Sequence, residues 1–269
     1  MTLQLIDTHC HLYLDEFSGD LKEVCGRALQ KGVTRILLPA ISSVSLEQMN
    51  RLSHPGICFY KMAGIHPCEI SEKIQADEEQ LYKTAARDSI IAIGETGLDY
   101  YWSRDWIDDQ KRSLKIHCAV AKALDKPIVL HNRESTSDLL DLIEEEQDGS
   151  LKGVWHCFTG TPEEGKRAIG LGLALGIGGV LTFKNSGVAN AVRELPLESM
   201  VLETDAPYLA PVPKRGKRNE PSFVAYTAER LAEVMDLPVE EIAEITSRNA
   251  EELFGIQVKG NREEGTGNR

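Results

Sequence analysis

SIIAIGETGLD, residues 89–99, is an almost unbroken apolar stretch with a carboxylate, Glu95, in its second half. Short runs of this kind, rich in β-branched residues, are typical of strands that are buried on both faces of a parallel sheet. Comparable runs recur along the whole chain. We expect strands at 3–11, 34–41, 59–67, 89–99, 126–134, 152–160, 173–181 and 199–209.

Segments with helical periodicity lie between these strands and after the last one. They cover 19–31, 43–53, 75–87, 106–124, 135–147, 162–170, 185–193, 221–236 and 238–255. Eight strands that alternate with helices in 269 residues predict an α/β fold, the (β/α)8 TIM barrel, which usually takes about 250 residues. An open doubly wound sheet is the alternative, but no predicted strand is followed by the Gly-rich turn of a dinucleotide-binding fold.

The domain organisation expected from this pattern is simple. We see no internal repeat and no linker in the sequence, and predict a single barrel domain over residues 1–258. The polar, Gly-containing segment 259–269 is expected to be a disordered tail.

Composition narrows the classes of function. Acidic residues outnumber basic ones by 42 to 30, so a broad basic surface for gripping long duplex DNA is not expected. A nucleic-acid end in a metal-lined cleft is compatible with this charge, because metal ions supply local positive charge. The sequence has no apolar run of the ~20 residues that span a membrane and no signal-peptide pattern at its N-terminus. Its six cysteines form no C-x-x-C pair, so we expect a cytoplasmic protein with reduced thiols.

Imidazole and carboxylate side chains occur at the C-terminal ends of the predicted strands, where a barrel forms its active site. They are His9, His11, Glu95, His131, His156 and Asp205. Taken alone, the two N-terminal histidines are a weak signal, and either carboxylate could belong to a cap or a turn. Six such groups at one end of a barrel instead predict a divalent-metal site, and their number suits two ions that share a bridging carboxylate.

Alternation along a strand sharpens this prediction. His9 and His11 share one face, so Cys10 between them is expected to pack against the helix layer. The same parity is expected to turn Cys157 away from the site. Asp7 lies on the face of His9, one step deeper, and we expect it to orient that imidazole.

Two further features lie close to the predicted mouth of the barrel. His66, in GIHP at the end of the third predicted strand, is either a core or turn histidine or a substrate contact. The segment PKRGKR, residues 213–218, follows the last strand. A basic run is usually solvated, but its place above the site of an acidic protein favours contact with a phosphate.

Several motifs together resemble one known family. DTHCH, GIHP, GETGLDY, PIVLHNRE, HCFTG, LETDAPYLAP, GKRNEP and RNAEELFG occur in this order between about residue 5 and residue 256. They resemble the motifs of the TatD family of metal-dependent deoxyribonucleases, which belongs to the amidohydrolase superfamily of (β/α)8 barrels. The resemblance implies one metal ion on His9, His11 and Asp205. It implies a second ion on His131 and His156, with Glu95 as the bridge.

The resemblance also implies roles around the ions. Asp205 would act as general base, and Glu203 would support a ligand or an ordered water from behind. His66 and Arg133 match positions near the phosphate.

The sequence departs from the family pattern at a few positions. Cys68 stands where many members have a second histidine, and Leu114 and His117 stand where others have Phe and Gln. These departures bear on the substrate and leave the implied metal ligands intact.

We therefore expect a metal-dependent hydrolase that cleaves DNA as a 3′–5′ exonuclease on single strands or 3′ ends. It would use two divalent ions (Mg²⁺, Mn²⁺ or Zn²⁺) and need no obligate protein partner or membrane. The alternative is an amidohydrolase-type enzyme that cleaves a C–N or ester bond in a small molecule. Such enzymes often bridge their metals with a carboxylated lysine, where this chain has Glu95. A third class, a non-catalytic metal-binding protein, fits a complete ligand set with a general base less well.

Overall fold

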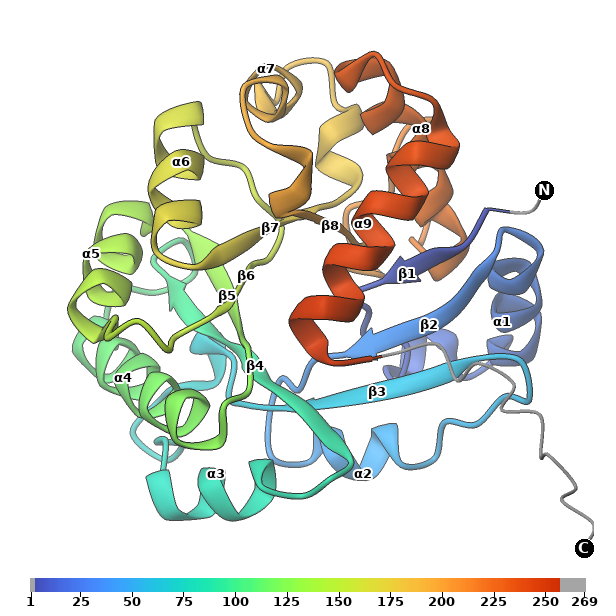
Figure 1. Ribbon diagram of the computed structural model, residues 1–269. Coiled ribbons are helices and arrows are strands. Elements are labelled where there is room, and N and C mark those ends of the chain that lie inside the picture. Colours follow the sequence, from blue (N-terminus) through green and yellow to red (C-terminus); the bar gives the residue numbers. More distant parts are fainter. Residues whose placement is uncertain (1–2, 257–269) are drawn as a thin grey trace, which may run out of the picture.

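The computed structural model describes residues 3–256. Its strands are β1 (Leu5–Asp7), β2 (Val33–Leu38), β3 (Cys58–Ala63), β4 (Ile90–Asp99), β5 (Ile128–Arg133), β6 (Gly153–Trp155), β7 (Leu173–Ile177) and β8 (Met200–Leu202). They form one parallel sheet in chain order, and the helices surround it (Figure 1). The α-helices are α1 (Leu21–Gln30), α2 (Ser45–Met49), α3 (Glu78–Ala85), α4 (Ile107–Leu124), α5 (Thr136–Glu146), α6 (Pro162–Gly170), α7 (Val188–Arg193), α8 (Val224–Met235) and α9 (Val239–Phe254). Short 3-10 helices are η1 (Asp15–Phe17), η2 (Pro67–Glu69), η3 (Gly179–Thr182), η4 (Leu197–Ser199) and η5 (Pro221–Phe223).

The sheet closes between its first and last strands. The amide of Thr8 donates to the carbonyl of Leu202 at 3.0 Å, and the amide of Asp205 donates to the carbonyl of His9 at 2.9 Å. Closure removes both sheet edges, so every strand has two neighbours. The (β/α)8 barrel predicted from the alternation of strands and helices is therefore confirmed.

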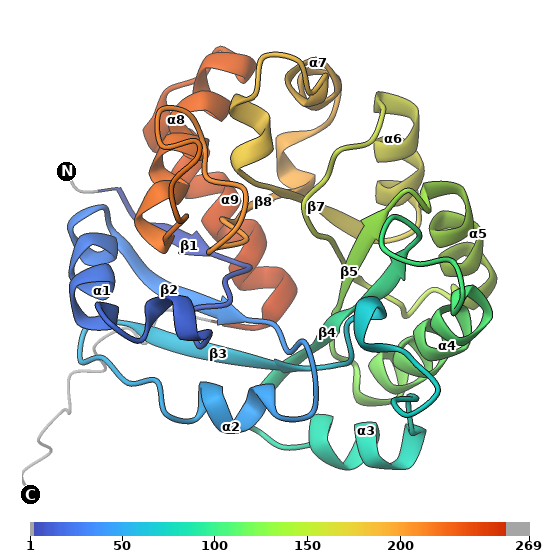
Figure 2. The ribbon, with the colours of Figure 1, turned by 180° about the vertical axis from the view of Figure 1, so that it is seen from behind.

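The barrel interior is filled by one apolar side chain from nearly every strand. These side chains are Ile6, Leu37, Met62, Ala92, Val129, Val154 and Val201. Ala250 and Phe254 of α9 pack against the same cluster. Accordingly, α9 crosses one end of the barrel, in front of the strands in Figure 1 and behind them in Figure 2. The loops that follow the C-terminal ends of the strands lie at the opposite end of the barrel from α9.

Several strands are shorter than predicted. β1 ends at Asp7 instead of residue 11, β6 ends at Trp155 and β8 ends at Leu202. The chain leaves the ladder at these points and forms hydrogen bonds between loops, such as that from the amide of His11 to the carbonyl of Ala206. The expected site residues on these three strands therefore lie just beyond them. The disorder predicted for 259–269 falls outside the described residues.

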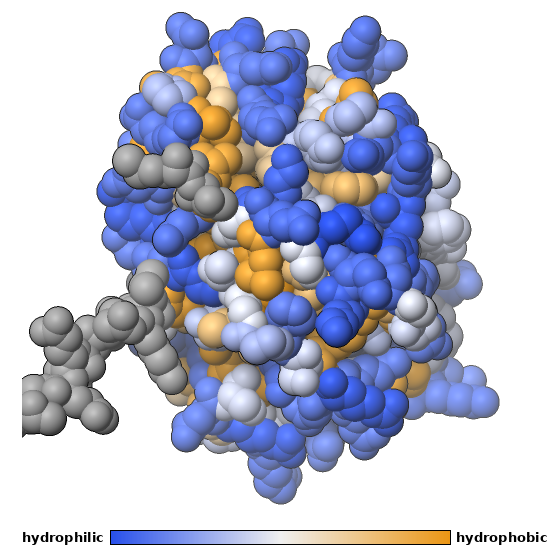
Figure 3. Space-filling model, turned by 90° about the vertical axis from the view of Figure 1, so that its right-hand side faces the viewer, coloured by the Kyte–Doolittle hydropathy of each residue, from blue (hydrophilic) through white to orange (hydrophobic). Residues whose placement is uncertain are grey.

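The surface gives no sign of a membrane-spanning element. Within residues 3–256, every helix is too short or too polar to cross a bilayer. The side of the molecule that carries α1 is mostly hydrophilic, with small, separate apolar patches (Figure 3).

Candidate metal centre

The structure brings all of the predicted ligand residues together at the C-terminal end of the barrel, and Glu95 lies at their centre. Oε2 of Glu95 lies 3.2 Å from Nε2 of His9 and 3.5 Å from Nε2 of His11. Oε1 lies 3.0 Å from Nδ1 of His131 and 3.4 Å from Nε2 of His156. The two oxygens of this one buried carboxylate thus face different imidazoles.

Asp205 completes the group on the Oε2 side. Its Oδ1 lies 3.5 Å from Nε2 of His11 and 3.8 Å from Nε2 of His9. Its side chain is 14% exposed, whereas that of Glu95 is 2% exposed. Burial alone would raise the pKa of Asp205, but the hydrogen bond from His11 and the charges of nearby imidazoles hold that pKa below its usual range. Asp205 is therefore an ionised carboxylate that solvent can reach.

The carboxylates of the site raise the pKa values of His131 and His156, whereas burial lowers those of His9 and His66. Burial would raise the pKa of Glu95, but the charges of His9, His66 and His156 hold it well below its usual range. Burial would likewise lower the pKa of His156, but the charges of Glu203 and Glu95 raise it to about 10. The raised pKa of His156 shows that the carboxylates around it stabilise positive charge. The same negative charge would favour a bound metal cation.

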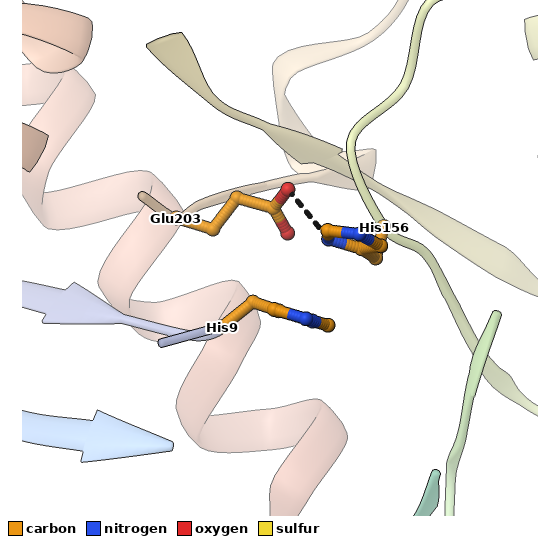
Figure 4. Close-up of side chains that lie close together, drawn as sticks. All are labelled: His9, His156 and Glu203. Atoms are coloured by element: carbon orange, nitrogen blue, oxygen red, sulfur yellow. Dashed lines mark hydrogen bonds and ion pairs between the residues drawn. The ribbon is translucent and has the colours of Figure 1, made fainter. Parts of the chain in front are cut away.

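Glu203 lies behind His156. Its Oε1 accepts a hydrogen bond from Nδ1 of His156 at 3.0 Å and another from the amide of Cys157 at 2.7 Å. Figure 4 shows this contact, with the ring of His9 alongside. The rings of His9 and His156 stack with their centroids 3.6 Å apart. Because Glu203 occupies Nδ1, the Nε2 atom of His156 is left facing Glu95.

His66 lies inside this centre. Its Nε2 is 3.3 Å from Nδ1 of His131 and 3.5 Å from Oε1 of Glu95, and its Nδ1 accepts the amide of Cys68 at 3.1 Å. His66 therefore caps η2, as expected of a turn histidine, and also lies beside the second set of donors, while its contact with a substrate stays a prediction.

Asp99 was missed in the sequence. It is the last residue of β4, and its Oδ2 lies 2.9 Å from Nε2 of His131. Burial would raise the pKa of Asp99, but the hydrogen bond from His131 and the charge of that ring lower it to about 2. Asp99 thus holds one ring nitrogen of His131 and turns the other towards Glu95. The sequence could have indicated Asp99 because it lies four residues after Glu95, at the C-terminal end of the same strand.

Tyr13 was also missed. Its hydroxyl donates to the carbonyl of Pro39 at 2.8 Å and lies 3.1 Å from Nδ1 of His11. It lies in a turn after β1, two residues after His11, where strand alternation no longer applies.

One of the two expectations for cysteines is wrong. Cys10 is fully buried in the core between barrel and helices, as alternation predicted. Cys157 is only half-buried and lies outside that core. Its amide donates to Oε1 of Glu203, so the residue lies next to that carboxylate, and burial and the charges of Asp205 and Glu203 raise the pKa of its thiol well above the usual range. The physical reason is that β6 ends before Cys157, whose φ of 49° breaks the alternation.

The expectation for Asp7 is also wrong. Its Oδ1 accepts the amides of Thr204 at 2.9 Å and His9 at 3.4 Å, and its Oδ2 accepts the hydroxyl of Thr204 at 2.6 Å. Asp7 therefore ties the backbone after β1 to the loop after β8 and does not contact the imidazole of His9.

The basic loop 213–218 is only partly available for an anion. Arg218 forms an ion pair with Asp20 at 2.7 Å. Arg215 lies over the ring of Phe183, 4.1 Å from its centroid, and lines a pocket of about 530 Å³ together with Lys184. The expected phosphate contact is thus restricted to part of the loop.

The donors fit a divalent metal. Three groups have ligand atoms that all lie within 4.8 Å of one another: His9–His11–Asp205, His66–Glu95–His131 and His9–His156–Glu203. The Nε2 atoms of His9 and His11 lie 3.3 Å apart beside the same carboxylate oxygen, and Nδ1 of His9 is buried without a hydrogen-bond partner among the described residues. A cation that accepts one lone pair from each of the two Nε2 atoms would remove the repulsion between them, and imidazole with carboxylate suits Zn²⁺ or Mn²⁺.

Comparison with known proteins identifies the family of this chain. The family described as TatD related DNase matches residues 6–255. YabD of Bacillus subtilis, named a metal-dependent hydrolase, is 37% identical over 94% of this chain and 99% of its own length. YcfH of Escherichia coli K12, named likewise, is 34% identical over 94% of this chain and 96% of its own. The crystal structure of YjjV, a TatD homologue from Escherichia coli K12, matches with a TM-score of 0.87 and 31% identity, over 96% of this chain and 100% of that one. Because these matches span nearly the whole chain, the protein belongs to the TatD family.

Proposed function

We propose that this hydrolase cleaves phosphodiester bonds of DNA at a centre of two divalent metal ions, releasing nucleotides from the 3′ end of a single strand. The observation that carries the proposal is the position of Glu95, whose two oxygens face separate sets of imidazoles. The match to TatD related DNases supports a nucleic-acid substrate. The direction of cleavage rests on the family resemblance alone.

The donors divide naturally between two ions. His9, His11 and Asp205 would hold one, His131 and His156 the other, and Glu95 would bridge them. Ions bound there would neutralise charge on the phosphate and activate a water molecule. Mg²⁺, Mn²⁺ and Zn²⁺ are all compatible with this mixed donor set.

The remaining chemistry belongs to the side chains. Asp205 is ionised and partly accessible, so it can take the proton of the attacking water as general base. Asp99 and Glu203 keep His131 and His156 oriented towards Glu95. Arg133, exposed at the end of β5, supplies a positive charge for a non-bridging phosphate oxygen.

Asp205→Asn tests this proposal. Loss of the base is expected to lower metal-dependent release of nucleotides from single-stranded DNA by roughly 10²- to 10⁴-fold. The matched control is Asp88→Asn, an exposed carboxylate just before β4, at the far end of the barrel. Both variants should keep the wild-type circular dichroism spectrum. Equal nuclease activity in the two variants would contradict the proposed role.

The same preparation separates the alternative functions. Wild-type protein is assayed with oligonucleotides, a simple phosphodiester, cyclic amides and esters. Hydrolysis of the amides or esters in place of the phosphodiesters would favour the amidohydrolase alternative. Glu95 occupies the strand position where a carboxylated lysine would bridge the metals, and this favours phosphodiester chemistry.

A further inference from the structure

Tyr101 and Trp102 form an exposed aromatic pair in the loop after β4. Their side chains are 50% and 69% exposed, and Trp102 is the most exposed large apolar side chain in the described part of the chain. The two rings meet edge to face, with centroids 4.9 Å apart and planes at 86°. This packing uses the edge of one ring and leaves flat aromatic surface open to solvent.

Asp99 connects the backbone of this pair to the candidate metal centre. Oδ1 of Asp99 accepts the backbone amides of Tyr101 at 3.0 Å and Trp102 at 3.2 Å, while its Oδ2 contacts His131. His131 in turn contacts Glu95. One buried carboxylate therefore positions both the backbone of the aromatic pair and an imidazole of the candidate metal centre.

Arg133 adds a positive charge to the pair. Its Cζ lies 3.7 Å from the ring centroid of Tyr101 and 5.3 Å from that of Trp102. It follows His131 by two residues on β5, so both side chains rise on the same face of the strand. Within residues 3–256 the guanidinium contacts these rings and forms no ion pair, which leaves its charge available to an anion.

We propose that Tyr101, Trp102 and Arg133 form a binding site for an unpaired nucleotide next to the scissile phosphate. Trp102 stacks on the base, and Arg133, held against Tyr101, binds the phosphate of the same strand. This proposal rests on the proposed nuclease function and specifies its substrate as a strand with unstacked bases.

Stacking explains why the substrate must be unpaired. A base inside a duplex has both faces covered by its neighbours, so it cannot also cover an aromatic ring. An unpaired base can, and every base has a π-face, which makes such a site tolerant of sequence. An aromatic ring beside a cation is the combination that proteins use to bind single-stranded nucleic acid. The charge of Arg133 also gives this acidic protein a local attraction for a polyanion.

Trp102→Leu tests the site. Binding is measured in the Asp205→Asn background with Mn²⁺, by fluorescence anisotropy of a labelled short oligo(dT), the same strand with abasic sugars, and a blunt duplex. Trp102→Leu is expected to weaken oligo(dT) binding by roughly tenfold or more, while Trp102→Phe restores most of the affinity. The Asp205→Asn protein and the Asp205→Asn/Trp102→Leu protein should bind the abasic strand with equal affinity, because this strand has no base to stack.

Tyr82→Leu serves as control, since Tyr82 is an exposed aromatic residue of α3, 43% exposed, that lies outside the site. If Trp102→Leu and Tyr82→Leu bind oligo(dT) equally well, or if Trp102→Leu changes only the oligomeric state, the stacking site is overturned. Cleavage of oligo(dT) by wild-type protein would still uphold the nuclease function in that case. Absence of both cleavage and binding would overturn the two proposals together.

Discussion

His117 is fully buried, and both of its ring nitrogens have backbone partners. Nε2 accepts the amide of Ile65 at 3.1 Å, in the segment that leads to His66, and Nδ1 donates to the carbonyl of Ser113 at 2.7 Å. This side chain fastens α4 to the loop after β3, a role that its mid-helix position did not suggest. Burial lowers its pKa to about 4.

This shift makes stability depend on pH. Between its ordinary pKa of 6.5 and about 4, the unfolded chain takes up a proton on His117 that the folded chain does not. The free energy of unfolding therefore falls as pH falls through this window, by roughly 3 kcal/mol in all from this group. His117→Gln keeps an acceptor for Ile65 but cannot titrate. We expect its melting temperature to fall less between pH 7 and pH 4.5 than that of wild type. Parallel curves would show that His117 does not titrate in this way.

β7 illustrates how a strand makes room for the site. A Cβ on Gly176 would collide with Oε2 of Glu203 and lie 3.0 Å from the Cα of His156. A Cβ on Gly178, two residues on, would lie 3.5 Å from Oε1 of Glu203, an ordinary contact. Substituting alanine at each of these two positions therefore tests whether Gly176 is needed to leave room for the side chain of Glu203.

Gly176→Ala is expected to displace Glu203 from His156. Losing the partner of a metal-binding histidine typically costs roughly 10- to 100-fold in activity or metal affinity, and both quantities should fall in this variant. Gly178→Ala is the matched control and should stay close to wild type in both. A similar loss in the two variants would mean that the loss comes from a general disturbance of the backbone around β7 and not from displacement of Glu203.

The proposed ligands come from five strand ends that are distant in the chain, from His9 after β1 to Asp205 after β8. An ion held there would link much of the barrel and bind the folded state only. Excess metal at about 100 times its dissociation constant would then add about 2.7 kcal/mol. For a chain of this size we expect chelator-treated protein to gain roughly 5–10 °C in melting temperature on adding Mn²⁺ or Zn²⁺.

Glu95→Gln should lose most of this gain, because it weakens the bridge. Elemental analysis after metal loading checks the number of ions. Less than one equivalent with each of Mg²⁺, Mn²⁺ and Zn²⁺ would exclude the two-ion centre.

Where strands are regular, the sequence predicted which side chains meet. Val129 fills the barrel interior, and His131 follows it by two residues within the same strand, β5. Period-two alternation is a local property of an extended chain, so it can be read without the fold. Ala92 also fills the interior, but Glu95 follows it by three, because the register of β4 shifts between Ile93 and Thr96. Such irregularities depend on pairing with neighbouring strands and leave no pattern in the sequence.

The sequence by itself determined the barrel, the family and the residues gathered at its C-terminal end. All three follow from periodicity, from the order of the motifs and from the rule that strand ends in a barrel converge. The tertiary structure decided which atoms face one another: Asp99 on His131, Asp7 on Thr204, and Arg133 over Tyr101. These contacts join residues from different strands and loops. Their distances are set by how the strands pair and where each one ends, which no single segment encodes.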